Sequence, residues 1–194
     1  MFPRKSISLS RYDESALVRA LGDAEGGLRE TAFVELIRRG EKRGWEAYNF
    51  LTLDPVFAAL FVSPKDPFDG VGVLATPAPF DRVRLAWPGA AESGSFVGRR
   101  TLAIDFRHRR LNVIRLTAGE GDDNDPVREG LGEVEFRVSD MDAAVSRLLN
   151  PGAGERGRVV LLPRDPDENG RFLLVHVPAA RRTRTVLVRL VSDK

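Results

Sequence analysis

The stretch that decides the fold is residues 101–116, TLAIDFRHRRLNVIRL, in which two apolar β-type segments flank a basic turn. We expect a β-hairpin with Phe106 opposite Leu111. One face then carries Leu102, Ile104, Phe106, Leu111 and Val113, and the other carries Ala103, Ile114 and Leu116. Because both faces are partly apolar, the hairpin is predicted to lie inside the fold, with helices covering one side.

The residues that precede the β region supply those helices. Asp13 is placed to cap a helix over 14–24, and a second helix is predicted over 28–39, ended by Gly40. Shorter helical segments are expected near Trp45 and after Asp54-Pro55, up to Val62. The break at 63–67 separates a helical segment, 1–66, from a β-rich region, 67–194. We expect the two to share one core.

The β-rich region shows a period of two. Apolar residues alternate with polar ones over 82–87 and over 133–138, and both stretches are predicted to be strands. Asp140 is placed to cap a helix over 141–149, and strands are expected over 158–162, 171–177 and 183–191. The fold class is therefore α+β, with the N-terminal helices packed on a mainly antiparallel sheet and one further helix near 140–149.

Composition excludes several classes of function. The chain has no cysteine, so disulfides, thiolate metal sites and cysteine nucleophiles are excluded. Its net charge is only +2, which does not by itself indicate a nucleic-acid partner. No apolar run approaches the roughly 20 residues of a membrane span. We expect a cytoplasmic protein that uses no membrane.

A helical resemblance covers residues 14–43. The pattern of Leu17, Leu21, Asp23, Arg29, Ala32, Leu36 and Gly40 resembles a single HEAT-type repeat. That resemblance implies a lone helical hairpin with a tendency to bind proteins, since a solenoid needs about three stacked repeats. The alternative is an ordinary amphipathic hairpin that covers a sheet.

A second resemblance covers residues 132–191. The expected order of strand, helix and three strands resembles the module of the vicinal oxygen chelate, or glyoxalase-like, superfamily, and residues 134–145, VEFRVSDMDAAV, are similar to its opening. Members that use a metal take His or Glu ligands from the first and later strands. Here only Glu133, Glu135 and His176 lie near suitable positions. These folds normally use two modules, and none is predicted upstream.

Two short motifs suggest other ligands. Residues 70–75, GVGVLA, match a dinucleotide fingerprint, but that motif must open a helix, which Pro77 and Pro79 are expected to prevent.

The second motif is acidic. Asp165, Asp167 and Asn169 precede Gly170 as in a calcium loop, although His176 stands where a bidentate glutamate is needed. A tight turn explains the same residues. They remain the candidate metal ligands, and no cofactor is expected.

The arginines of the hairpin are the principal candidate binding residues. Arg107, Arg109 and Arg110 lie on its turn, with Arg99 and Arg100 at its start. Clustered guanidinium groups bind phosphates or acidic protein surfaces. The leading hypothesis is a non-enzymatic interaction or assembly subunit that binds a protein partner or a second copy of the chain. The alternatives are a nucleic-acid-binding module and a glyoxalase-like protein that binds a small ligand or metal.

Overall fold

A computed structural model describes residues 9–96, 99–117, 128–151, 158–163, 170–178 and 183–192. Its helices are α1 (Glu14–Leu21), α2 (Gly26–Leu51), α3 (Pro55–Ala58), α4 (Pro77–Ala86) and α5 (Met141–Leu149). Its strands are β1 (Phe68–Ala75), β2 (Ala91–Phe96), β3 (Arg99–Phe106), β4 (Arg109–Arg115), β5 (Gly130–Val138), β6 (Val159–Leu161), β7 (Arg171–Val177) and β8 (Arg184–Ser192). The predicted α+β class is confirmed. No helix in the described ranges is long and apolar enough to cross a membrane.

The strands form one sheet in the order β2-β3-β4-β1-β5-β8-β7-β6. Each half of the sheet has the same layout, because β1 pairs parallel with β4 and β5 pairs parallel with β8, while the outer strands pair antiparallel. The two halves join through the antiparallel pair β1–β5. The chain therefore contains two successive modules of strand, helix and three strands.

The first of these modules was not predicted, and α4 is the reason. Residues 82–87 lie mostly in this helix and not in a strand, because Phe80, Val83 and Trp87 also satisfy a helical spacing toward the core. Pro77 and Pro79 do not prevent the helix. They lie in its first turn, where the backbone N–H groups have no partner within the helix.

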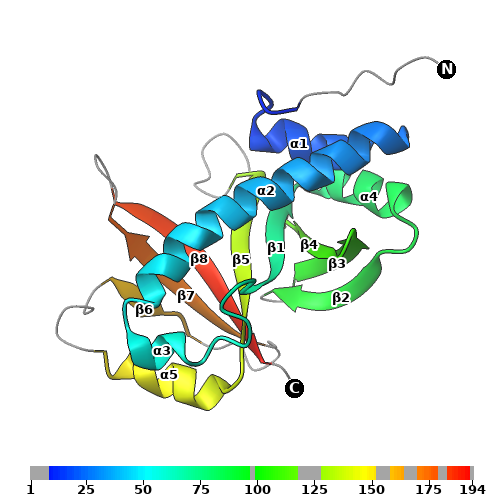
Figure 1. The fold of residues 1–194 in the computed structure, drawn as a ribbon. Coiled ribbons are helices and arrows are strands. Elements are labelled where there is room, and N and C mark those ends of the chain that lie inside the picture. The colour runs from blue at the N-terminus through cyan, green and yellow to red at the C-terminus, as the bar shows by residue number, and fades with distance from the viewer. Residues whose placement is uncertain are drawn as a thin grey trace.

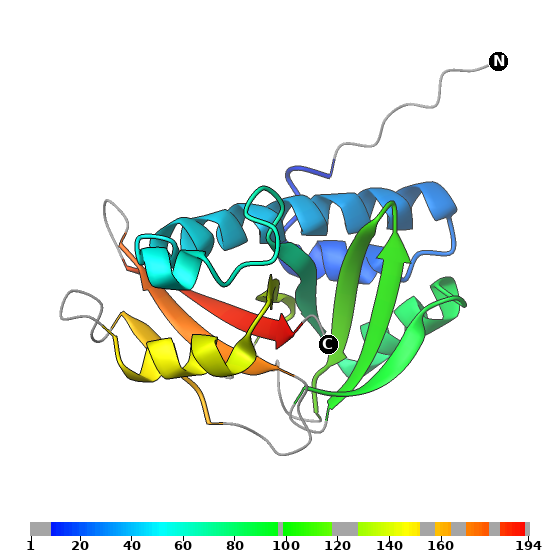
Figure 2. The same ribbon diagram turned by 60° about the horizontal axis from the view of Figure 1, so that its bottom comes forward.

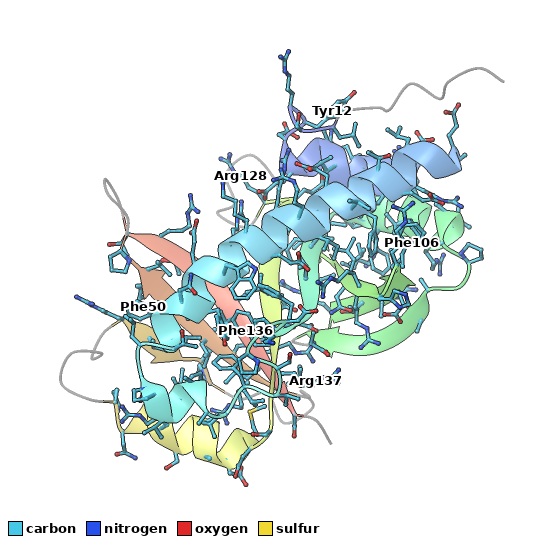
Figure 3. All side chains as sticks on the ribbon, viewed as in Figure 1. Tyr12, Phe50, Phe106, Arg128, Phe136 and Arg137 are labelled. Carbon is cyan, nitrogen blue, oxygen red and sulfur yellow. The ribbon has the colours of Figure 1, made fainter. Side chains whose placement is uncertain are left out.

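All five helices contribute to one side of the sheet. Buried side chains of α1, α2 and α4 pack with β1, β3 and β4, and those of α2, α3 and α5 pack with β5, β7 and β8. Helix α2 crosses both halves of the sheet (Figures 1 and 2). Phe106 lies beneath its N-terminal half, and Phe50 belongs to its other end (Figure 3).

Two glycines of α2 bring this helix close to β1. A Cβ atom at Gly40 would lie 2.4 Å from Cγ1 of Val71, and one at Gly44 would lie 2.2 Å from Cε1 of Phe68. The expectation that Gly40 ends the helix is therefore wrong. Gly40 lies inside a 26-residue helix, where its lack of a side chain allows the close approach.

The central hairpin has the expected faces but a tighter turn. Phe106 pairs with Arg109, so the turn consists of Arg107 and His108, whose φ values are 51° and 60°. This register differs from the expected one by two residues, which leaves every side chain on the same face. Leu102 and Ile104 of β3 pack beneath the helices as predicted.

The HEAT-type resemblance gains no support from this arrangement. Helix α1 has eight residues and α2 has 26, and both bury their apolar faces against the sheet. The pair therefore corresponds to the amphipathic hairpin that covers a sheet.

An ion pair ties α3 to α5. Asp54 is 8% exposed, caps α3 by accepting from the Val56 amide, and binds Nε of Arg147. Burial alone would raise the pKa of Asp54, but the hydrogen bonds from Arg147 and Val56 outweigh it and hold the pKa below its ordinary value of 3.8. The carboxylate therefore stabilises the fold above that pH, and this contribution is lost as the pH falls through the lower, folded-state pKa.

We expect Asp54→Asn to lower the free energy of unfolding at neutral pH by about 2 kcal/mol, because it leaves Arg147 without its anion. It should also reduce the loss of stability on acidification below about pH 4. Urea unfolding at several pH values measures both effects. The control is Asp81→Asn, whose carboxylate is 48% exposed and 3.9 Å from Arg84. Equal effects of the two substitutions would contradict this role for Asp54.

Two glycines of α2 provide a matched test of its packing. We expect Gly40→Ala to destabilise the protein by about 1–3 kcal/mol, because the added methyl group overlaps Val71. Gly27→Ala should instead stabilise it by up to about 1 kcal/mol, since nothing lies within 4 Å of that position and alanine favours helix. Chemical denaturation distinguishes the two signs.

Candidate functional site

The sheet face opposite the helices is polar, and a glycine pair makes room for it. On β1, Gly70 pairs with Glu135 of β5 and Gly72 pairs with Glu133. A Cβ atom at Gly70 would lie 3.0 Å from Oε2 of Glu135, and one at Gly72 would lie 2.4 Å from Cγ of Glu133. The two glutamate side chains therefore lie across β1. The GVG sequence is a strand that accommodates carboxylates, and its glycines are not a phosphate-binding turn.

Glu135 is fixed by two donors from neighbouring strands. It is 2% exposed, and its Oε1 accepts from Nδ2 of Asn112 at 2.7 Å and from Nη1 of Arg189 at 2.9 Å. Oε2 lies above Gly70 and has no hydrogen bond to the described residues. One oxygen of this buried carboxylate therefore accepts two hydrogen bonds, and the other accepts none from the described residues. The second oxygen can accept a proton or a hydrogen bond from a bound molecule.

Glu135 lines a pocket of about 730 Å³ that extends from this face to α5. The pocket draws its walls from both halves of the sheet and from the start of α5. Its charged lining consists of Arg110, Arg137, Arg171 and Arg189 with Asp69, Asp105, Glu135 and Asp142. Its apolar lining consists of Ala91, Ala103, Met141, Val145 and Val191. This mixture suits a small molecule that has polar ends and an apolar part.

Ion pairs hold three of the four arginines. Arg110 binds Asp105 at 3.0 Å, Arg137 binds Asp69, and Arg189 binds Glu135. Adjacent residues of β5 lie on opposite faces of the sheet (Figure 3). Phe136 packs in the core beneath α2, whereas Arg137 lines the pocket. The pairs keep the charges of this face in place.

A shallower hollow of about 820 Å³ adjoins the pocket and shares Asp69, Asp105, Arg110 and Arg137 with it. Its other walls are residues 62, 63 and 66–68 and the β3–β4 turn. The two ion pairs that contain these residues therefore form the boundary between the hollows.

The structure brings three of the five candidate arginines together. Arg107, Arg109 and Arg110 line this second hollow. Arg109 binds both carboxylate oxygens of Asp66 at 3.0 Å and lies 3.0 Å from Glu41, whose pKa is raised by burial despite this arginine. Arg107 lies over the ring of Phe106, with 5.0 Å between the guanidinium carbon and the ring centroid.

The other two arginines lie elsewhere. Arg99 and Arg100 begin β3, seven and six residues from its turn end and so about 23 and 20 Å away along the strand. Arg100 binds Glu92 and lies over the ring of Phe80. The structure therefore does not join the five residues into one surface.

The residues present do not fit the metal site of the glyoxalase-like resemblance. His176 bonds Thr185 through Nδ1, two strands away from β5, so it does not meet Glu133 and Glu135. Beside Glu135 lies the guanidinium group of Arg189, a fixed cation. No group of three possible metal ligands occurs in the described part of the chain. Asp165, Asp167 and Asn169 lie outside the described residues.

Comparisons with known proteins found similarity in fold only. No family model and no curated protein matches the chain. Methylmalonyl-CoA epimerase from Mycobacterium tuberculosis is 20% identical, over 66% of this chain and 88% of that one, with a TM-score of 0.42. Protein EC4020 is 17% identical, over 84% and 88%, with a TM-score of 0.46. A glyoxalase/bleomycin resistance protein/dioxygenase superfamily member from Vibrio splendidus is 9% identical, over 64% and 97%, with a TM-score of 0.36.

Sequence reasoning missed Asn112 and Arg189 as members of the site. Each is an ordinary polar residue on a strand, and only the strand order brings them to Glu135. A signal was nevertheless present. The Gly-Val-Gly of β1 and the Glu-Val-Glu of β5 have matching spacing, so the large polar side chains of one strand lie over the glycines of the other.

We expect Arg189→Met to destabilise the protein by about 3 kcal/mol, because it leaves the carboxylate of Glu135 buried without its cation. Removing both charges, in Glu135→Met/Arg189→Met, should recover at least about half of that loss. Urea unfolding of the single and double variants measures the coupling. Arg100→Met is the control, since its partner Glu92 is exposed. Strictly additive effects would rule out a coupled pair.

Proposed function

We propose that this chain is a glyoxalase-like small-ligand-binding protein, whose site is the pocket that extends from the polar face of the sheet to α5. The observation that carries this proposal is the open Oε2 of Glu135, a buried carboxylate that lines a pocket of about 730 Å³. Side chains that are fixed before binding lose little freedom when a ligand arrives.

The double module supports this choice. Residues 68–115 and 130–192 each supply one half of the sheet, and the pocket lies across the strands where the halves meet. A site between two such units is enclosed by both, so a small molecule can bury most of its surface there.

The two rival functions have weaker support. The apolar faces of α1 and α2 are already occupied by the sheet, which leaves the leading hypothesis of an interaction subunit without its helical contact surface. A nucleic-acid module needs arginines available to phosphates, and Arg109 and Arg110 are held by Asp66 and Asp105.

Filling the pocket tests the proposal. Ala103 lines it from β3, and we expect Ala103→Trp to abolish binding of small polar fragments, because the indole ring occupies their space. A fragment library is screened by amide chemical-shift mapping on the labelled protein. Bound fragments should perturb β1, β4, β5 and β8 in the unmodified protein and none of these strands in the variant.

Lys42→Trp is the matched control, since it adds the same ring at an exposed position of α2. It should leave fragment binding unchanged. If no fragment perturbs these strands in the unmodified protein, or if Ala103→Trp binds the same fragments equally well, the pocket is not a ligand site.

A further inference from the structure

Resting on this proposed function, we infer that the ligand carries an anionic oxygen group, a carboxylate or a phosphate, which binds the guanidinium group of Arg171. The ligand would lie with this anion at the α5 end of the pocket and a hydrogen-bond donor at Oε2 of Glu135. The pocket would then select small organic acids that have a polar donor and a short apolar part.

The charge pairing within the pocket singles out Arg171. Arg110, Arg137 and Arg189 are each held by an acidic side chain. Arg171 has no ion pair in the described part of the chain, and its buried Nε has no acceptor there. A buried donor without a partner costs free energy, so an anion that bonds this nitrogen gains affinity from relieving that cost.

The surroundings of Arg171 define the rest of the ligand. Met141, Val145 and Val191 line the same pocket and supply apolar contact. Asp142 also lines it, but it is exposed on the first turn of α5 and no ion pair joins it to Arg171. The planar fork of a guanidinium group matches the two oxygens of a carboxylate or a phosphate.

The pocket joins the two polar ends around the ends of β7 and β8. Glu135 pairs with Arg189, and Arg189 pairs with Phe172, so the backbones of Glu135 and Phe172 are two strand spacings apart, about 10 Å. Arg171 itself pairs with Leu190 of the helix-side core, so its side chain leaves β7 on the α5 side of the sheet. Both side chains line one pocket because the pocket continues past Gly170 and Ser192 to α5.

Hexanoate and hexyl phosphate are the probes, because each joins an anion to a short apolar chain. They are titrated into the labelled full-length protein, with hexylamine as the cationic counterpart. We expect at least one anionic probe to bind saturably and to perturb the amides of β7, β8 and the start of α5. Arg171→Gln should weaken that binding by about tenfold or more. Arg84→Gln, which removes a charge on α4 outside the lining of the pocket, should leave it unchanged.

Thermal unfolding shows whether Arg171→Gln remains folded, and Arg171→Lys keeps the charge without the fork. Intermediate binding by Arg171→Lys supports recognition through the guanidinium fork. The tighter of the two anionic probes identifies the group as carboxylate or phosphate. The inference is overturned if neither anion binds at this end, if hexylamine binds equally well, or if Arg171→Gln is folded and binds normally. Fragments blocked by Ala103→Trp but indifferent to Arg171 would leave the pocket intact as a ligand site and remove only this assignment.

Discussion

The close packing of β1 on both of its faces is the constraint on which the rest of the structure depends. On one face, Gly40 and Gly44 let α2 rest directly on Val71 and Phe68. On the other face, Gly70 and Gly72 let Glu135 and Glu133 lie across the strand. A strand flanked in this way cannot shift by one residue, because each side chain would move to the wrong face. The join between the two halves of the sheet is fixed by the same contacts.

That packing also explains how charge is kept inside the protein. Burying a carboxylate is costly unless hydrogen bonds and a counter-charge compensate. Asn112 donates a hydrogen bond to one oxygen of Glu135, and Arg189 supplies a hydrogen bond and the counter-charge to the same oxygen. The other oxygen is thereby held in position and remains available to a bound molecule. The ion pairs at Asp69 and Asp105 hold two more arginines at the rim. The resulting surface is rigid and nearly balanced in charge, which favours recognition by hydrogen-bond geometry over attraction by net charge.

Local patterns predicted much of this fold. The cap at Asp140 and the faces of the hairpin around Leu102 were confirmed, because each depends on neighbours in sequence or on a period of two. The upstream module was missed because Val83 and Trp87 fit a strand and a helix equally well over so short a segment. The site was incomplete for a different reason. Asn112 and Arg189 reach Glu135 only through parallel pairings whose register the sequence alone does not reveal.

The duplicated layout of the sheet has a consequence for how a ligand is oriented. Val71 of one half pairs with Val134 of the other, so these two residues occupy corresponding positions in the two modules. Their parallel partners, Leu111 and Val188, correspond in the same way.

One residue further along each strand, the pair Gly72 and Asn112 in the first half corresponds to the pair Glu135 and Arg189 in the second. One half thus contributes space and a neutral amide where the other contributes an ion pair. A symmetric duplication would offer a bound molecule two equivalent, head-to-tail poses. Here the two halves differ at the centre of the sheet, so the pocket favours one orientation of a bound molecule over the other.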